Sequence, residues 1–225
     1  MAKTSWATVN RSVPLGDGVS RVFCTAELDF NHVAGNYVIL RSDIPNPEKS
    51  GEPLKRAYSI SNPPDANDPR EFHFTVSRVG PVSDWLIGRS AGDRIEFSGP
   101  WGKKFRALPE DAPGPVHLVA TGTGFSPIGA MALDRCAHGR NRVGVWWQTD
   151  DAYDPAALDE LAKSERFDVT VGPDLLGDVP VDVGAMYFLA GDGALLIPLE
   201  DRLLAAGVPA TAVRTEYFFN KRPKP

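Results

Sequence analysis

The chain has 225 residues and a formal net charge of -5, with 42% hydrophobic and 24% charged residues. This composition fits one large domain, or two of ordinary size, with a buried core. No lysine or arginine run reaches the density that follows a phosphate backbone, which excludes nucleic acid as an expected partner. The N-terminus lacks the apolar segment of a secretory signal, and no apolar run reaches the ~18 residues of a membrane span. The expected compartment is the cytoplasm.

The two cysteines, Cys24 and Cys136, are far apart in the sequence and have no companions. They cannot form a disulfide framework or a zinc or iron-sulfur ligand cluster. Both are expected to be buried thiols, the common state of free cysteine. The sequence predicts no metal site.

Short β-type runs broken by turn residues fill the first half of the chain. They read VSRVFCTAEL, NYVILRS, RAYSISN, EFHFTVSRV and DRIEFSGPWG, at residues 19–28, 36–42, 56–62, 71–79 and 93–102. Their spacing, with GDG, NPP and GP as turn signals, predicts an antiparallel barrel or sandwich. The segment ALPEDAPGPV has no periodicity and predicts a boundary between domains at residues 1–108 and 115–225.

Strand and helix patterns alternate in the second half of the chain. Strands are expected at residues 116–121, 142–148, 167–172 and 185–191, and helices at residues 126–137, 155–164 and 195–207. Such alternation predicts parallel β-α-β units in a doubly wound sheet. Ligands of such sheets bind at the carboxyl ends of the strands.

A glycine-rich turn follows the first strand of this second half. Thr121, Gly122, Thr123 and Gly124 come directly after VHLVA, and Pro127 lies at the start of the next helix. Glycines let the backbone approach a phosphate, and a helix N-terminus offers free N–H groups, so a pyrophosphate is the predicted ligand. The turn is not the fingerprint G-x-G-x-x-G, because Pro127 stands at its third glycine. A plain strand-to-helix connection is the alternative interpretation.

The stretch RAYSISN places a fixed cation, a phenol and a hydroxyl close together, at Arg56, Tyr58 and Ser59. A guanidinium makes bidentate, charge-assisted bonds to phosphate of about 1.5–3 kcal/mol each. An aromatic ring stacked on another contributes about 0.5–1.5 kcal/mol beyond the burial of area. The alternative interpretation is an ordinary amphipathic strand with one wet and one buried face.

A barrel that carries R-x-Y-S, followed by a parallel domain that begins T-G-T-G-x-x-P, resembles the ferredoxin-NADP reductase superfamily along essentially the whole chain. The resemblance implies an N-terminal antiparallel Greek-key β-barrel that binds FAD and a doubly wound parallel α/β domain that binds NAD(P). In the family the arginine binds the flavin diphosphate, the tyrosine packs on the isoalloxazine and the serine lies near flavin N5. By resemblance these roles fall to Arg56, Tyr58 and Ser59, with Ala57 between them, and Ser59 is a candidate catalytic residue.

The segment EFHFTVSRVGPVSDWL resembles the second flavin element of the family, in which a strand passes the cofactor and a turn caps the diphosphate. The implied cofactor-binding residues are His73, Phe74, Thr75 and Val76 in the strand and Gly80, Pro81, Val82 and Ser83 in the turn. Ser83 is expected to open a short helix. A packed or surface histidine is the alternative interpretation of His73.

The nicotinamide side departs from the family pattern. Members commonly carry C-G-x-x-x-M after the strand that corresponds to YFLAG, with the cysteine near the transferring hydride. Here Ala190, Gly191 and Asp192 occupy these positions, so the thiol is missing, although some flavin reductases of the superfamily also carry Ala-Gly. Gly191 and Asp192 remain candidate cofactor-binding residues.

The segment RTEYFF resembles the terminal strand of the family. The resemblance places Glu216, a candidate catalytic residue, and an aromatic residue, Tyr217 or Phe218, beside the flavin face that the nicotinamide must reach. A hydrophobic final strand is the alternative interpretation.

The choice between NADH and NADPH depends on the end of the second parallel strand. NADP-dependent relatives generally place a cation there, whereas VGVWWQTDD runs into Asp150 and Asp151. An acidic end repels a 2′-phosphate and can accept a hydrogen bond from a ribose hydroxyl, which favours NADH. Arg142 and Arg166 remain alternative phosphate ligands, and a solvated loop is the alternative interpretation of the two aspartates.

Together these features predict a reductase that takes a hydride from NAD(P)H onto bound FAD and passes electrons to a separate ferredoxin or oxygenase component. No cysteine set in the chain can hold a [2Fe-2S] cluster. Lys103, Lys104 and Arg106 are a candidate docking patch for an acidic ferredoxin, or else a solvated face. Two alternatives stay open: an NAD(P)H:flavin reductase that releases reduced flavin, and a non-catalytic electron-transfer subunit that holds FAD.

Overall fold

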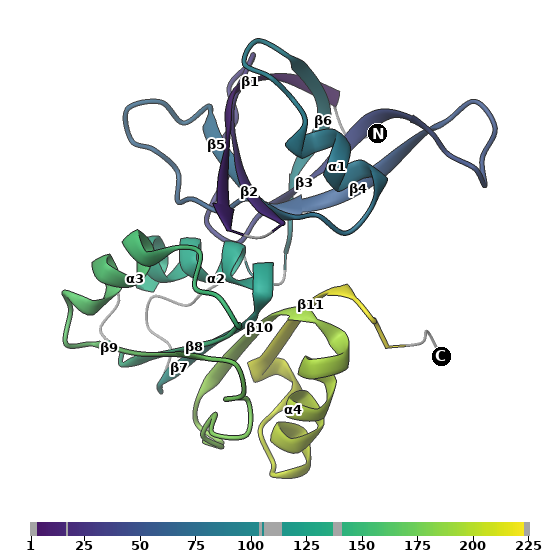
Figure 1. Cartoon of the computed structure of the whole chain (residues 1–225). Coiled ribbons are helices and arrows are strands. Elements are labelled where there is room, and N and C mark those ends of the chain that lie inside the picture. The colour runs from purple at the N-terminus through teal and green to yellow at the C-terminus, as the bar shows by residue number, and fades with distance from the viewer. Residues whose placement is uncertain (1–3, 17, 104, 106–113, 137–140, 223–225) are drawn as a thin grey trace. The chain divides into compact units, whose positions relative to one another are not determined.

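The computed structural model describes residues 4–16, 18–103, 105, 114–136 and 141–222, without the side chains of residues 135 and 136. The chain divides into two compact units, residues 1–103 and 104–225 (Figure 1). Most of the boundary segment predicted at residues 107–116 lies outside the described residues, so the domain limits stay a prediction.

The first unit contains β1 (Thr4–Gly16), β2 (Val19–Ala26), β3 (Tyr37–Pro45), β4 (Pro53–Ser59), β5 (Glu71–Ser77), α1 (Pro81–Ile87) and β6 (Arg94–Trp101). Its strands form one antiparallel sheet in the order β4-β3-β6-β1-β2-β5. The sheet is barrel-like but not closed, with β4 and β5 at its edges. The predicted antiparallel class is confirmed.

Alternating residues of these strands form the core of the first unit. The pattern is regular in β2, where Val22, Cys24 and Ala26 are buried, and it continues in β5 with Phe72 and Phe74. Burial raises the pKa of the Cys24 thiol to about 12, so the prediction of a buried thiol is confirmed there. The side chain of the second cysteine lies outside the described part of the chain.

One central strand, β1, was not predicted from the sequence. It pairs with β2 on one side and with β6 on the other. Its register with β2 shifts between Val9 and Arg11 and again between Pro14 and Gly16. Each shift exchanges the inward and outward positions, so the strand has no continuous period of two.

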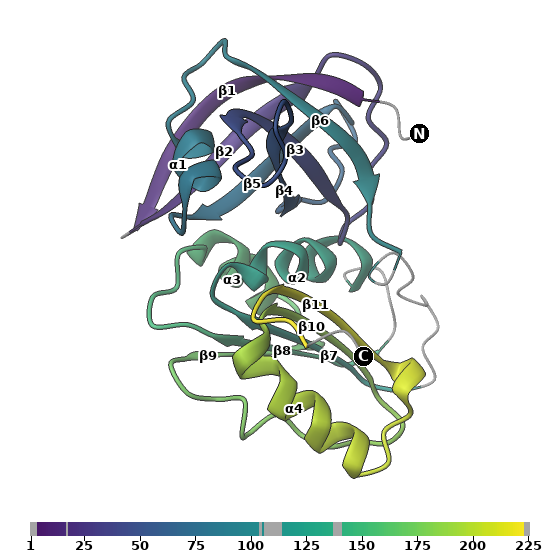
Figure 2. The same cartoon turned by 90° about the vertical axis from the view of Figure 1, so that its right-hand side faces the viewer.

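The second unit contains β7 (Val116–Thr121), α2 (Phe125–Met131), β8 (Val143–Gln148), α3 (Pro155–Ala162), β9 (Phe167–Gly172), β10 (Met186–Asp192), α4 (Gly193–Ala205) and β11 (Val213–Phe219). Its parallel strands have the order β11-β10-β7-β8-β9. Figure 2 shows α2 and α3 on one face of this sheet and α4 on the other. The predicted doubly wound sheet is confirmed.

The strand order fixes where a ligand site can form in this sheet. The chain runs from β7 to β8 and β9 on one side, then returns at β10 on the other side of β7. The carboxyl ends of β7 and β10 therefore flank the topological switch point, the usual ligand site of open parallel sheets. Within the described residues, no helix is long and apolar enough to cross a membrane.

Candidate functional site

The middle of β4 is exposed on both faces. Lys55, Arg56 and Ala57 are consecutive exposed residues, whereas the faces of an amphipathic strand would alternate. Arg56 donates from Nη1 to the Lys55 carbonyl oxygen at 2.9 Å, and it forms no ion pair with a described residue. These three residues lack the alternation that the amphipathic-strand interpretation expects, while Leu54 before them is buried and Tyr58 after them is half-buried. An exposed guanidinium without a carboxylate partner is free to meet an anionic ligand.

Tyr58 offers a neutral aromatic surface beside Arg56. Its ring is half-buried against the core, with its centroid 5.9 Å from that of Phe74. Burial raises the pKa of Tyr58 to about 12, although the positive charge of Arg56 acts in the opposite direction. The phenol therefore stays protonated at neutral pH. Ser59 is half-buried at the end of β4, opposite Tyr37 of β3.

The segment that follows β4 joins the edge of β5. Ser61 N–H donates to the His73 carbonyl oxygen at 2.8 Å, and Ser61 Oγ accepts from Thr75 N–H at 2.8 Å. In β5, Phe74 and Val76 are buried in the core. These contacts bring the predicted residues of β4 and β5 side by side.

The side chain of His73 lies on the opposite face of β5 from Phe74. Its ring centroid is 5.0 Å from that of Phe23, and it lines a cavity of about 540 Å³ with Arg11 and Asn62. Its Nδ1 is buried and has no hydrogen-bond partner among the described residues. Burial, followed by the charges of Arg21, His32 and Arg11, lowers the pKa of His73 to about 3. The structure thus places the imidazole apart from Tyr58, as the packed-histidine interpretation expects.

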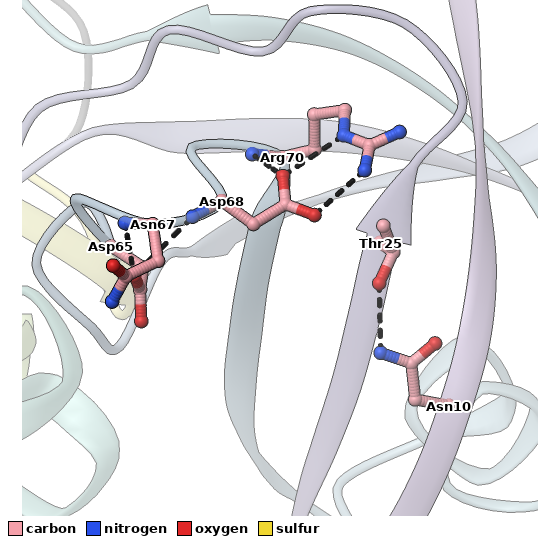
Figure 3. A network of polar contacts seen from close by, with 6 residues as sticks. All are labelled: Asn10, Thr25, Asp65, Asn67, Asp68 and Arg70. Atoms are coloured by element: carbon pink, nitrogen blue, oxygen red, sulfur yellow. Dashed lines mark hydrogen bonds and ion pairs between the residues drawn. The ribbon is translucent and has the colours of Figure 1, made fainter.

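The loop between β4 and β5, which forms one wall of this cavity, is held by its own aspartates (Figure 3). Asp65 Oδ1 accepts from the Asn67 N–H at 2.7 Å. Asp68 accepts from Arg70 through both carboxylate oxygens, at 2.9 Å from Nε and 2.7 Å from Nη2. The hydrogen bonds of this network involve none of the predicted flavin residues.

The turn before α1 uses the Ser83 hydroxyl for its own structure. Ser83 Oγ accepts from the N–H groups of Val79 and Gly80 at 2.9 and 3.0 Å, and it donates to the Gly80 carbonyl oxygen at 2.7 Å. Pro81 occupies the first helical turn, and Val82 is buried. Since its hydroxyl is committed to the turn, any contact of Ser83 with a diphosphate falls to its backbone.

The glycine turn packs tightly against the end of β10. A Cβ added at Gly124 would collide with the Ala190 carbonyl oxygen, and one added at Gly191 would collide with Thr121 Oγ1. Thr121 Oγ1 also accepts from the Asp192 N–H at 2.7 Å. The sequence analysis explained Gly124 by the approach of a phosphate and made Gly191 a candidate cofactor-binding residue, but both glycines are already required by contacts within the protein.

Gly122 is different from these two glycines. It has a φ of +49°, and a Cβ there would meet no atom of the described part of the chain within 4 Å. Thr123 is half-buried, and Pro127 is buried in α2. The turn is therefore open at Gly122 and closed at Gly124.

The carboxylate of Asp192 already has two hydrogen-bond donors within the protein. Its Oδ1 accepts from the Ala194 N–H at 2.9 Å, which caps α4, and from Asn220 Nδ2 at 2.8 Å. The predicted cofactor contact of Asp192 would thus have to coexist with helix capping.

Two aromatic residues that the sequence analysis did not single out contact the glycine turn. Trp147 Nε1 and the Tyr153 hydroxyl each donate to the Gly122 carbonyl oxygen at 2.9 Å. Trp147 is the second of two tryptophans at the end of β8, and Tyr153 lies in the loop that follows. A tryptophan at the carboxyl end of a parallel strand was the signal available in the sequence.

Asp150 and the two alternative arginines lie at opposite ends of β8 and β9. Asp150 is exposed beyond the carboxyl end of β8, whereas Arg142 and Arg166 directly precede β8 and β9. Arg142 pairs with Asp168 at 3.5 Å. A six-residue strand is about 20 Å long at about 3.3 Å per residue. Neither arginine is therefore placed to bind a phosphate beside Asp150, which corrects that alternative.

One of the two aromatic candidates in β11, Tyr217, makes a side-chain contact with α4. Tyr217 donates its hydroxyl to Glu200 of α4, and Thr215 Oγ1 is 3.4 Å from the same carboxylate. Alternation then directs Glu216 to the opposite face of the sheet from Tyr217. The register pairs Glu216 with Ala190, the position where the family cysteine is absent. Tyr217 does not share a face with Glu216. The register with β10 shifts at Phe218, because Gly191 pairs with Tyr217 and Asp192 with Phe219, so alternation does not assign the face of Phe218.

Of the predicted basic patch, only one member belongs to the described part of the chain. Lys103 is exposed there, whereas Lys104 and Arg106 lie outside the described residues. The patch therefore stays a prediction.

Comparison with known proteins gives relatives for both units. The reductase component 1 of terephthalate 1,2-dioxygenase from Comamonas sp. is 31% identical over 157 residues, which cover 68% of this chain and 44% of that protein. Ferredoxin--NADP reductase B from Sorangium cellulosum is 38% identical over 100 residues, covering 44% of this chain and 37% of that protein. No family model matches the chain.

A solved protein structure has a similar fold over nearly the whole chain. The cytochrome P450 reductase GcoB from Amycolatopsis superposes with a TM-score of 0.81 at 26% identity, covering 96% of this chain and 70% of that one. The chain spans about half the length of the curated relatives it matches. Both units, their order along the chain and these relatives agree with the resemblance carried by R-x-Y-S and T-G-T-G-x-x-P. The chain belongs to the ferredoxin-NADP reductase superfamily.

Proposed function

We propose that this chain is a reductase that takes a hydride from NADH onto bound FAD and passes electrons to a separate ferredoxin or oxygenase component. FAD supplies the step between a two-electron donor and one-electron acceptors. The chain's own residues bind and orient the coenzymes and set the charge around them.

The fit of the first unit to FAD is carried by β4. Arg56 is exposed and has no ion pair with a described residue, which suits a diphosphate. Tyr58 next to it is a neutral, half-buried ring, which suits one face of a flavin. In our proposal Ser59 donates its hydroxyl to the flavin edge. In our proposal the side chain of His73 takes no part, because it lies on the face of β5 opposite Phe74, the ring that Tyr58 contacts.

The second unit supports NADH in preference to NADPH. Asp150 is the exposed acid at the carboxyl end of β8, and Arg142 and Arg166 are at the other end of the strands. An aspartate there accepts from the ribose 2′-hydroxyl and repels a 2′-phosphate. In our proposal the turn at Gly122 and Thr123 receives the pyrophosphate. Glu216, which pairs with Ala190, and the aromatic residue Phe218 lie beside the nicotinamide.

The electron acceptor is proposed from the relatives. The Comamonas protein is named as a component of a dioxygenase and GcoB as a cytochrome P450 reductase, so both names refer to oxygenase systems. A reductase of this kind hands electrons to an oxygenase or to a ferredoxin that serves one. We propose the same class of acceptor for this chain.

The test is a flavin spectrum followed by anaerobic addition of NADH. The purified protein is passed through a desalting column to remove free flavin, and its absorbance spectrum is recorded. Retained flavin colour that NADH bleaches within seconds, faster than NADPH does, supports the proposal.

Each other outcome favours a different function. A colourless protein that still reduces added flavin would be the flavin reductase alternative, which the Ala-Gly pair at residues 190 and 191 favours. A yellow protein that neither NADH nor NADPH bleaches would be the non-catalytic subunit. A protein that neither retains nor reduces flavin refutes the proposal.

A further inference from the structure

The carbonyl oxygen of Gly122 accepts three hydrogen bonds. One comes from the Phe125 N–H in the same turn, and the others come from Trp147 Nε1 and the Tyr153 hydroxyl, both at 2.9 Å. A carbonyl oxygen has two lone pairs, so this acceptor is saturated. The peptide cannot rotate without leaving buried donors unsatisfied, which is costly in a protein interior.

The two side-chain donors are themselves held in place by packing. Trp147 is fully buried and stacks on Phe125, the first residue of α2, with ring centroids 4.1 Å apart and planes at 10°. Tyr153 is 7% exposed and meets the Trp147 ring edge-on, with centroids 4.7 Å apart. The direction of the Gly122 carbonyl is thus set by the core of the second unit.

A fixed carbonyl also fixes the amide that follows it. In a trans peptide the C=O and the next N–H point in opposite directions. The N–H of Thr123 therefore points away from Trp147 and Tyr153. An anion that reaches this side of the turn meets a donor whose direction is already set.

Tyr153 belongs to the same loop as Asp150. This loop begins where the Thr149 N–H donates to the Gly172 carbonyl oxygen at 2.9 Å, and it ends where Asp154 caps α3. Between these anchors, the bond from Tyr153 to Gly122 joins the loop after β8 to the turn after β7. One hydrogen bond therefore connects the loop that carries Asp150, the residue proposed to contact the ribose 2′ position, to the turn proposed to bind the pyrophosphate.

We infer that Trp147 and Tyr153 are positioning residues for the nicotinamide dinucleotide: they orient the Thr123 amide toward the pyrophosphate and couple that turn to the loop that distinguishes NADH from NADPH. This inference rests on the proposed NADH site and adds a mechanism to it. Affinity for the pyrophosphate and selectivity between a 2′-hydroxyl and a 2′-phosphate are then linked. Removing the hydrogen bond from Tyr153 to Gly122 changes both.

The experiment compares Tyr153→Phe with a matched tyrosine variant in equilibrium binding. Tyr153→Phe keeps the ring against Trp147 and removes only the hydroxyl. Tyr187→Phe is the control, because the buried Tyr187 hydroxyl also donates to a backbone carbonyl of the same unit, that of Pro180 at 2.8 Å. Titration calorimetry with NAD⁺ and with NADP⁺ measures dissociation constants without any catalytic turnover.

We expect Tyr153→Phe to raise the dissociation constant of NAD⁺ about two- to tenfold, the usual worth of one hydrogen bond. The preference for NAD⁺ over NADP⁺ falls in the same variant, and Tyr187→Phe changes neither quantity. In steady-state reduction of ferricyanide, KM for NADH rises in Tyr153→Phe while kcat stays unchanged, because the hydroxyl touches no reacting atom.

The outcomes separate the inference from the proposed function. A wild-type chain that binds neither NAD⁺ nor NADP⁺ refutes the nucleotide site, and the inference falls with it. If the wild type binds NAD⁺ and Tyr153→Phe matches it in affinity and preference, the coupling is wrong and the proposed function stands. Equal losses in Tyr153→Phe and Tyr187→Phe also overturn the inference, because the effect is then one of stability.

Discussion

Acidification is expected to destabilise the first unit through His73, and replacing this residue should remove that part of the pH dependence. In the folded chain the pKa of His73 is about 3, because burial disfavours the charged imidazole and Arg21, His32 and Arg11 add repulsion. In an unfolded chain it is about 6.5. Since the folded value is the lower one, the unfolded state binds the proton first. The contribution to stability is complete above pH ~6.5 and is lost as the pH falls toward 3.

The size of this loss follows from the two pKa values. Proton linkage gives about 0.8 kcal/mol at pH 6 and about 2 kcal/mol at pH 5. The loss of about 2 kcal/mol at pH 5 is a measurable share of the roughly 5–15 kcal/mol by which a typical domain is stable.

The assay is urea unfolding of the wild type and of His73→Phe at pH 7.5, 6 and 5. Phenylalanine keeps an aromatic ring against Phe23, whose centroid is 5.0 Å from that of the imidazole. The wild type should lose about 2 kcal/mol more than the variant between pH 7.5 and pH 5. His73→Gln serves as a second non-titrating variant if phenylalanine disturbs the packing. Parallel pH profiles in all three proteins would show that His73 is not held neutral by burial.

Three further predictions concern the coenzyme sites. Arg56→Ala should weaken FAD binding about ten- to a hundredfold, because charge-assisted hydrogen bonds to the diphosphate are lost, and flavin release measures this. Lys55→Ala on the same strand is the control and should retain FAD. Equal flavin release from both variants would rule out the diphosphate role of Arg56. Gly124→Ala should lower the free energy of unfolding by about 3 kcal/mol or more, because the added Cβ collides with a carbonyl oxygen of β10. Gly122→Ala should lower it by only about 1 kcal/mol, because of the positive φ. Thermal unfolding measures both variants, and the reverse order would contradict the packing of the turn. Asp150→Asn should narrow the preference for NAD⁺ over NADP⁺ by removing a repulsion of about 1 kcal/mol, and an unchanged ratio of dissociation constants would mark Asp150 as a solvated residue.

The order of most elements in both units could be predicted because each of these elements has a local pattern of apolar residues. In β2 buried and half-buried residues alternate over eight residues, and β7 is an uninterrupted buried run of six. β1 was missed for a physical reason, since its two register shifts break the period that would identify it. Its place between β2 and β6 depends on pairing with distant segments, which no local pattern records.

The candidate sites show the same limit. The chemistry of Arg56 and Tyr58 was visible in their side chains, and alternation along β5 could have separated His73 from Phe74. The contact between Gly124 and the end of β10 could not be foreseen, because it joins segments far apart in the chain. The sequence therefore offered a ligand as the reason for a glycine that the protein's own backbone requires.

The glycine turn after β7 has one more consequence, for the thermodynamics of binding. Its conformation is fixed by Thr121, by the close approach of β10 and by the donors to the Gly122 carbonyl, all within the polypeptide. The conformational entropy of this segment is therefore lost during folding, before any dinucleotide arrives. Binding to such a preorganised turn carries no ordering penalty there, and its heat-capacity change reflects only the surface that the ligand covers.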